Sequence, residues 1–135
     1  YSGETGYTEF LANTDVLVCL LPLTAQTRGI LNRQTFEALP EGATLIHCGR
    51  GEHLVEADLI AALDSGHLRG AILDVFEKEP LPEGHPLWTH PGVVVTPHMA
   101  TMATFDVVVQ QILRNVGQLE AGQPLFNAVD LTRGY

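Results

Sequence analysis

Four residues whose side chains could bind an organic acid and move a proton follow apolar segments of the chain. Arg50 comes after ATLIHCG, Asp74 after GAIL, Glu79 at the end of the Glu77–Glu79 stretch, and His98 after VVVTP. A guanidinium binds carboxylates, and an imidazole with carboxylates nearby can exchange protons. Together these residue types predict a site that binds a carboxylate and transfers a proton.

Each of these residues also has an ordinary structural explanation. Arg50 lies between two glycines and could be a turn residue with a solvated head group. His98 could be structural, and Glu79, which precedes a proline, could be a loop carboxylate. Asp74 could cap a neighbouring backbone N–H. The functional interpretation is favoured because all four occur at equivalent ends of successive predicted strands.

The elements that must position these residues alternate along the chain. Apolar, β-branched segments predict buried strands, and the segments between them have helical spacing. This alternation predicts βαβ units with right-handed crossovers, in a doubly wound (Rossmann-like) α/β fold whose parallel sheet has helices on both faces. Ligands of such sheets bind outside the carboxyl ends of the strands. We expect strands at 16–22, 43–48, 70–76 and 93–98, and helices at 9–14, 32–39, 55–63 and 105–119.

Capping residues suggest where the helices begin and end. Thr8 is the expected N-cap of the first helix, and Asn32 that of the second. Gly66 and Gly122 stand where the third and fourth helices should stop.

Composition excludes several classes of partner. The 135 residues carry 7 Lys+Arg against 16 Asp+Glu, a formal net charge of −9, so nucleic acid or an anionic membrane is not an expected partner. No apolar run approaches the roughly 18–20 residues that span a bilayer. The N-terminus does not resemble a signal peptide. Two cysteines are too few for a disulfide framework, which favours a cytoplasmic protein with reduced thiols.

The remaining histidines and cysteines show no metal-binding spacing. There is no HExxH motif and no paired Cys/His pattern, so no zinc site is predicted. Cys19 is expected to be a small buried hydrophobe. His85 and His90 flank Trp88 in a loop and are expected to pack at the surface.

Three blocks of the sequence closely resemble one enzyme family. They are LPLTAQTRGILNRQTFEALPEGATLIHCGRG, LVEADLIAALDSGHLRGAILDVFEKEPLP and HPLWTHPGVVVTPHMA. In this order and spacing they are similar to the D-isomer-specific 2-hydroxyacid dehydrogenases. The ending VDLTRGY resembles the glyoxylate/hydroxypyruvate reductase branch of that family. The resemblance implies hydride transfer between NAD(P)H and a small 2-ketoacid.

The resemblance also implies a role for each candidate. Arg50 matches the arginine that binds the substrate carboxylate and also contacts the keto oxygen. His98 matches the acid/base, and Glu79 the carboxylate that orients its ring and stabilises the charged form. Asp74 matches the residue that holds the nicotinamide carboxamide. The positions that match cofactor contacts are Leu21, Pro22, Thr27, Cys48, Gly49, Arg50, Asp74, His98 and Ala100.

The sequence departs from the family pattern beside the expected nicotinamide position. His47 and Cys48 replace the more usual Asn and small residue before the arginine. Met99, Ala100 and Thr101 stand where much of the family has an Ile-Gly-Gly-like turn. Both departures could alter how the cofactor fits.

The chain lacks the G-x-G-x-x-G loop that holds the pyrophosphate in this family, since Gly3 and Gly6 follow no strand. We therefore expect residues 1–100 to be the second half of a dinucleotide-binding domain. Residues 101–135 would be a C-terminal helix and tail returning toward a substrate domain. On this interpretation the chain is part of a two-domain homodimeric enzyme, inactive alone. The cofactor is NAD or NADP, with NADP favoured by the branch. An NAD(H)-sensing regulatory or dimerisation module is the alternative.

Overall fold

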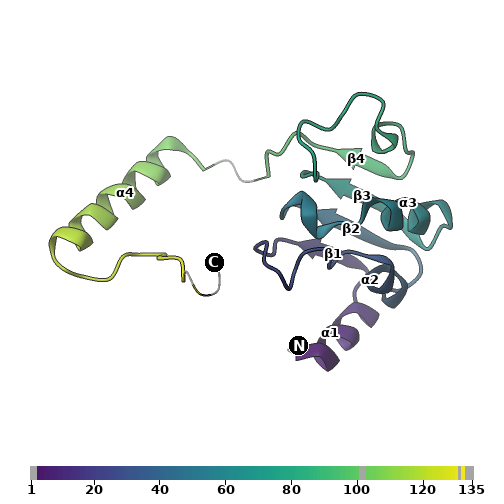
Figure 1. Cartoon of the computed structure of the whole chain (residues 1–135), viewed down its shortest axis with the longest axis horizontal. Helices are drawn as coiled ribbons and strands as arrows, with labels where there is room; N and C mark the ends of the chain where they lie inside the picture. The colour runs from purple at the N-terminus through teal and green to yellow at the C-terminus, as the bar shows by residue number, and fades with distance from the viewer. Residues whose placement is uncertain (1–2, 101–102, 131, 133–135) are drawn as a thin grey trace. The chain divides into compact units, whose positions relative to one another are not determined.

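The computed structural model describes residues 3–100, 103–130 and 132. It forms two compact units, Tyr1–His98 and Met99–Tyr135. The first contains the sheet, and the second contains one long helix (Figure 1). Within the described ranges, no helix has both the length and the apolar character needed to cross a bilayer.

The first unit is built on a parallel sheet of four strands in the order β1-β2-β3-β4. This confirms the predicted α/β, Rossmann-like architecture. Each strand ends earlier than predicted, because the residues at its carboxyl end leave the ladder and form the loops of the candidate site. The strands are β1 (Val16–Cys19), β2 (Ala43–His47), β3 (Leu68–Leu73) and β4 (Val93–Val95).

Three helices accompany the sheet: α1 (Gly3–Ala12), α2 (Arg33–Ala38) and α3 (Glu56–Asp64). The predicted N-cap of α2 is confirmed, since the Asn32 side chain accepts a hydrogen bond from the Thr35 backbone N–H at 3.3 Å. Gly66, at φ +77°, follows the end of α3 as predicted.

The predicted start of α1 is wrong, because Thr8 lies inside the helix rather than at its N-cap. The helix extends toward the N-terminus beyond the expected start. There the hydroxyl of Tyr7 lies 3.2 Å from Oγ1 of Thr35, so that a tertiary hydrogen bond ties this turn to α2. A contact of this kind overrides a local capping preference.

One face of the sheet is buried and the other is exposed. Leu17, Leu45 and Leu73 face the core, whereas Val18 and Val94, on the opposite face, are 50% and 57% exposed. The expectation that helices cover both faces is therefore wrong within the first unit. The strands lie in the sheet in the order in which they occur in the chain. Because crossovers between parallel strands are right-handed, every connecting helix then lies on the same face of the sheet.

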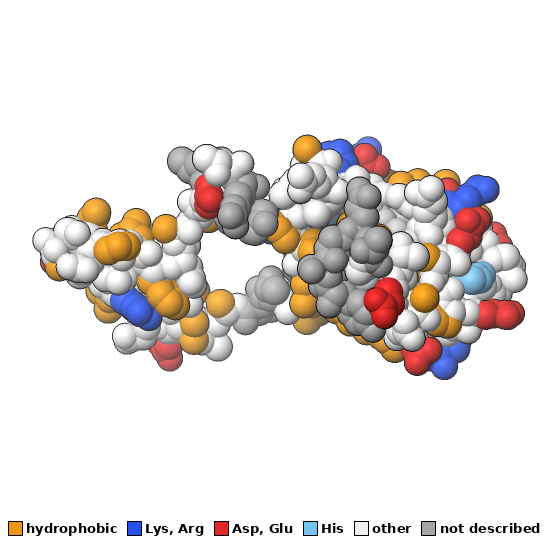
Figure 2. Space-filling view, turned by 90° about the horizontal axis from the view of Figure 1, so that it is seen from below, with side chains coloured by type: hydrophobic (Ala, Val, Ile, Leu, Met, Phe, Trp, Pro, Cys, Tyr) orange, Lys and Arg blue, Asp and Glu red, His pale blue; other side chains and the backbone are white. Residues whose placement is uncertain are grey.

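The second unit contains α4 (Phe105–Glu120), close to the predicted helix, and Gly122 follows it at φ +63°. The segment after α4 folds back onto it. The Asn115 side-chain oxygen accepts a hydrogen bond from the Phe126 backbone N–H at 2.8 Å, and the Arg114 guanidinium lies 3.9 Å from the centre of the Phe126 ring. Most apolar side chains of α4 are exposed, as Figure 2 shows for those on the face it views.

Candidate active site

The carboxyl ends of β2, β3 and β4 are joined by hydrogen bonds at one edge of the sheet. The Asp74 backbone N–H donates to the His47 carbonyl at 2.9 Å, and the Thr96 N–H donates to the Leu73 carbonyl at 2.9 Å. The loops that start here carry all four residues singled out in the sequence. Because neighbouring strand ends hold these loops together, the side chains they carry can meet.

His98 and Glu79 form the centre of the site. Nδ1 of His98 lies 2.8 Å from Oε2 of Glu79, and Oε1 of Glu79 accepts a hydrogen bond from the Phe76 backbone N–H at 3.0 Å. These side chains are 44% and 36% exposed, so the pair is open to a ligand. The hydrogen bond from His98 is the largest cause that lowers the pKa of the Glu79 carboxyl, and the hydrogen bond from Phe76, the charge of His98 and the charge of Arg50 follow in that order. Glu79 is therefore held as a carboxylate beside the imidazole.

The guanidinium of Arg50 also acts on this pair, since its positive charge makes the smallest of the contributions that lower the pKa of the Glu79 carboxyl. Its Nη1 donates to the Gly49 carbonyl at 2.8 Å, and within the described part of the chain no carboxylate forms an ion pair with it. The side chain is exposed. It therefore retains donors with which to bind an anion.

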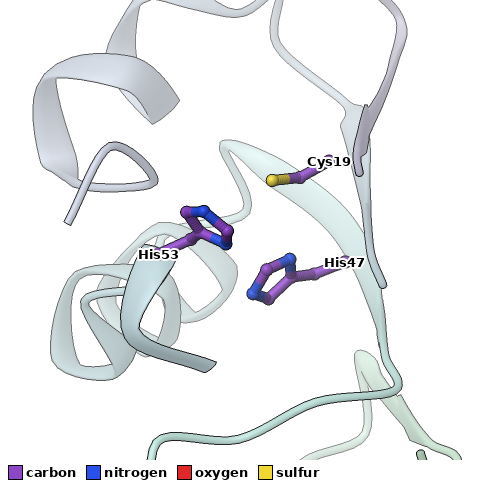
Figure 3. Close-up of side chains that lie close together, drawn as sticks. All are labelled: Cys19, His47 and His53. Carbon is purple, nitrogen blue, oxygen red and sulfur yellow. The ribbon is translucent and has the colours of Figure 1, made fainter. Parts of the chain in front are cut away.

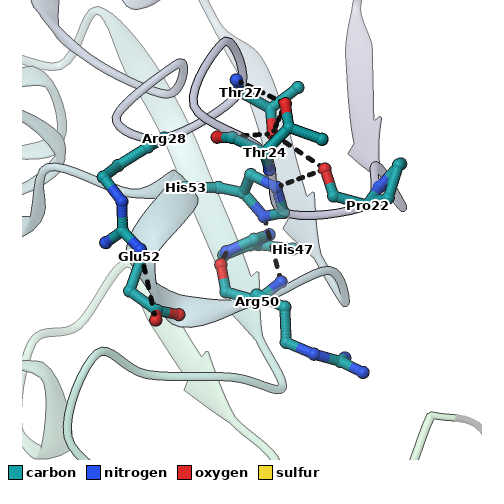
Figure 4. A network of polar contacts seen from close by, with 8 residues as sticks. All are labelled: Pro22, Thr24, Thr27, Arg28, His47, Arg50, Glu52 and His53. Atoms are coloured by element: carbon teal, nitrogen blue, oxygen red, sulfur yellow. Dashed lines mark hydrogen bonds and ion pairs between the residues drawn. The ribbon is translucent and has the colours of Figure 1, made fainter. Parts of the chain in front are cut away.

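Two buried histidines hold the backbone of Arg50 (Figure 4). Nδ1 of His53 accepts a hydrogen bond from the Arg50 N–H at 3.0 Å, and Nε2 of His47 lies 3.0 Å from the Arg50 carbonyl oxygen. Nε2 of His53 lies 3.3 Å from the Pro22 carbonyl oxygen, which ties this loop to the one after β1. Burial lowers the pKa of His47 to about 4, so its ring is neutral and its Nε2–H donates to Arg50.

His53 is not among the site residues predicted from the sequence, and His47 stands out there only as a departure from the family pattern. His53 occurs in a short 3-10 turn, η1 (Gly51–His53), in which it bonds back to the residue before the turn. A polar side chain three residues after Arg50 was the available signal.

The glycines on either side of Arg50 allow close packing. A Cβ at Gly51 would lie 1.9 Å from the carbonyl carbon of Phe76, and one at Gly49 would lie 2.9 Å from Nδ1 of His53. Neither position has room for a side chain. Gly51 therefore brings the Arg50 loop directly against the loop that leads to Glu79.

Asp74 lies at the end of β3 and is 2% exposed. It accepts a hydrogen bond from the hydroxyl of Thr96, at the end of β4. The neighbouring Cys48 is half-buried, and burial, followed by the charge of Asp74, raises the pKa of its thiol. Cys48 is therefore a neutral thiol, which does not suit the role of nucleophile.

The remaining predicted cofactor positions fall in two places. Leu21, Pro22 and Thr27 lie in the loop after β1, where the Thr27 hydroxyl donates to the Pro22 carbonyl at 2.7 Å and fixes the turn. Leu21 is exposed there. Ala100 belongs to the second unit.

A cavity of about 420 Å³ opens beside the central pair. Glu79 and His98 contribute its polar groups, whereas Phe76, Leu81 and Trp88 contribute apolar walls. Trp88 lies in the short turn η2 (Pro86–Trp88), and its Nε1–H donates to the Pro82 carbonyl at 3.0 Å. An apolar wall next to an acid–base pair limits water around the group that exchanges a proton.

The chain matches a known family and several of its members. Residues 3–100 match the model of the D-isomer specific 2-hydroxyacid dehydrogenase, NAD binding domain. The chain is 50% identical over 135 residues to glyoxylate/hydroxypyruvate reductase A of Salmonella heidelberg, covering all of this chain and 43% of the relative. It therefore spans less than half the length of that relative.

Two solved structures have closely similar folds. One is the D-isomer specific 2-hydroxyacid dehydrogenase of Xanthobacter autotrophicus Py2 in complex with NADPH and MES, with 47% identity and a TM-score of 0.95, covering 100% of this chain and 56% of that one. The other is the NADPH-dependent glyoxylate/hydroxypyruvate reductase of Sinorhizobium meliloti in complex with NADP and sulfate, with 42% identity and a TM-score of 0.93, covering 99% and 44%. The fold, the candidate residues at the carboxyl ends of the strands and these matches agree, and the chain belongs to the D-isomer-specific 2-hydroxyacid dehydrogenase family.

Proposed function

We propose that this chain supplies the catalytic residues of an NADP-dependent reductase of small 2-ketoacids such as glyoxylate or hydroxypyruvate. The observation that carries the proposal is the 2.8 Å contact between His98 and Glu79 with the charge of Arg50 close by. An anion-binding guanidinium beside an acid–base pair is what reduction of a charged ketoacid requires.

Each of the three residues has a separate task in the proposed reaction. Arg50 binds the substrate carboxylate through its planar fork and polarises the keto oxygen. His98 donates a proton to that oxygen as the carbonyl becomes a hydroxyl, and Glu79 stabilises the imidazolium that donates it. A bound NAD(P)H supplies the hydride. In the reverse direction, His98 takes the proton back from the hydroxyl.

The described residues fit the nicotinamide end of the cofactor. The buried carboxylate of Asp74, held by Thr96, is an acceptor suited to the carboxamide N–H. The pyrophosphate requires a glycine-rich loop, and the sequence of this chain has no G-x-G-x-x-G. NADP is favoured because relatives with this fold are described with NADP or NADPH bound. The chain alone is expected to bind the cofactor weakly and to have negligible reductase activity.

The experiment replaces the matching 135 residues of the Salmonella reductase with this chain. This chimera should oxidise NADPH when glyoxylate is added. His98→Ala should lower kcat by about 10²- to 10⁴-fold, whereas NADPH binding should survive because the other matched cofactor positions remain. His90→Ala is the matched control, since His90 pairs with Asp64 away from the site. A folded, NADPH-binding chimera without turnover, or full activity in His98→Ala, would refute the proposal.

We also propose that the whole enzyme is a cytoplasmic homodimer. Two free cysteines and no disulfide in the described residues support a reducing compartment. The exposed apolar side chains of α4 support burial against further protein surface. Light scattering of the chimera should give the mass of two chains, and a monomer at micromolar concentration would contradict the homodimer.

A further inference from the structure

Three buried side chains with metal-binding atoms meet behind the Arg50 loop. They are Cys19 at the end of β1, His47 at the end of β2 and His53 in η1 (Figure 3). The sulfur of Cys19 and one ring nitrogen of each histidine lie within 4.8 Å of one another. All three side chains are almost fully buried. They come from three separate segments, and only the fold brings them together.

One atom in the cluster has no hydrogen-bond partner. Nδ1 of His47 is buried and makes no hydrogen bond of normal geometry with the described residues, although the Cys19 backbone lies near enough to this ring to raise its pKa slightly. The other nitrogen of the same ring faces the Arg50 carbonyl oxygen and therefore carries the proton, so Nδ1 presents a bare lone pair. A buried polar atom without a partner is unusual and needs an explanation, which a bound metal ion or an ordered water can supply.

His47 already has the arrangement of a metal-ligating histidine. Such residues typically donate their second ring N–H to a backbone carbonyl or a carboxylate, which fixes the tautomer and the ring orientation. The contact between Nε2 of His47 and the Arg50 carbonyl, at 3.0 Å, is a bond of this kind. It points the free nitrogen at the space shared with Cys19 and His53 (Figure 3).

We propose that Cys19, His47 and His53 form a Zn²⁺ site. One thiolate and two imidazoles are a donor set that Zn²⁺ accepts, and three protein ligands leave a fourth position open. Normal Zn–S and Zn–N bond lengths require the ligand atoms to lie about 3.5 Å apart, so the side chains must close in by about 1 Å. Binding replaces the thiol proton of Cys19, which is released to solvent.

Zinc binding is linked to the backbone of Arg50 through His53. Nδ1 of His53 accepts a hydrogen bond from the Arg50 N–H, and Nε2 lies against the Pro22 carbonyl. If Zn²⁺ binds Nδ1, the Arg50 N–H loses its acceptor. If Zn²⁺ binds Nε2, the ring proton moves to Nδ1, which then cannot accept. Either way, the metal and the Arg50 N–H bond exclude each other.

This coupling bears on the proposed reductase activity, because it loosens the loop that carries the carboxylate-binding arginine. The metal site itself does not depend on that activity. Its tests therefore use binding measurements on the 135-residue chain without substrate or cofactor, so that failure of one proposal leaves the other standing.

The first test is titration of the chain with Co²⁺, a spectroscopic substitute for Zn²⁺. One equivalent should produce a thiolate-to-Co²⁺ charge-transfer band, and Zn²⁺ should remove it. Cys19→Ser should lose the band, whereas Cys48→Ser, which changes the other free thiol, should keep it. His85→Gln and His90→Gln, which change the histidines paired with carboxylates near the surface, should also keep it.

The second test needs no variant and so does not depend on whether Cys19→Ser folds. Addition of one equivalent of Zn²⁺ should shift the Arg50 amide resonance in a ¹H–¹⁵N spectrum, as expected when its acceptor is lost. No thiolate band with the unaltered chain, a band that survives Cys19→Ser or disappears in Cys48→Ser, or an unmoved Arg50 amide would each overturn the proposal.

Discussion

Gly51 and Phe76 approach so closely that a Cβ on the glycine would lie 1.9 Å from the carbonyl carbon of Phe76. Gly51 follows the arginine of the candidate site, and the Phe76 N–H bonds to the carboxylate of Glu79. This contact therefore sets how near the Arg50 loop comes to the Glu79–His98 pair. The two halves of the site depend on a position where only glycine fits.

Gly51→Ala should destabilise the chain. The added methyl overlaps backbone atoms that cannot rotate away, so one of the two loops must move, and overpacking of this kind costs about 1–3 kcal/mol or more. Urea unfolding, followed by the fluorescence of Trp88, measures the change. Gly117→Ala is the control, since nothing lies within 4 Å of a Cβ there, and it should not lower the midpoint. Equal midpoints for Gly51→Ala and the unaltered chain would contradict the packing argument.

Arg50→Lys in the Salmonella chimera should raise KM for glyoxylate by about 10- to 100-fold, because an ammonium cannot form the two parallel hydrogen bonds of a guanidinium. The positive charge remains, so binding of NADPH should change little. Arg69→Lys is a matched control on the outward side of β3, where Arg69 bonds to the hydroxyl of Thr44. An unchanged KM in Arg50→Lys would remove this arginine from substrate binding.

The Glu79 carboxyl should titrate below its ordinary pKa of 4.5, because hydrogen bonds from His98 and from the Phe76 N–H favour its charged form. A folded-state pKa below the unfolded one means that this group stabilises the fold above about pH 4.5 and that the contribution is lost as the pH falls through the folded value. Carbon-detected NMR of the side-chain carboxyl measures the titration.

His98→Ala removes the largest cause of this shift, so the Glu79 pKa should rise toward 4.5. His90→Ala should leave it unchanged, since His90 pairs with Asp64. If the titration of Glu79 is the same with and without His98, the pair seen in the structure does not form in solution.

His53→Ala should lower the free energy of unfolding by about 1–3 kcal/mol, because it empties the buried position of the His53 ring and leaves the part-buried N–H of Arg50 without this acceptor. His85→Ala removes a contact with Glu56 nearer the surface and a long, 3.4 Å hydrogen bond from the Leu87 N–H, and it should cost less, about 1 kcal/mol. Urea denaturation of both variants gives the comparison. A similar cost for the two would mean that the Arg50 loop does not rely on His53.

Much of the fold follows from local patterns. Apolar segments of strand length, separated by helical spacing, predicted the parallel sheet, and Asn32 marked the start of α2 correctly. These features depend on residues that are close together in the chain, so the spacing of residues in the sequence is enough to predict them. Thr8 was misleading because a contact between Tyr7 and Thr35, far apart in the sequence, extends α1 past its expected cap.

The sequence by itself determined which residues lie near the carboxyl ends of the strands, since the apolar segments are local features, although each strand ends earlier than predicted. It therefore identified Arg50, Asp74, Glu79 and His98 before their geometry was known. Only the tertiary structure decided that Gly51 must pack on Phe76 and that Cys19, His47 and His53 share one buried space. These contacts are between segments that are far apart in the sequence. They depend on which strands are neighbours in the sheet and on which loops then touch, so no fixed sequence spacing predicts them.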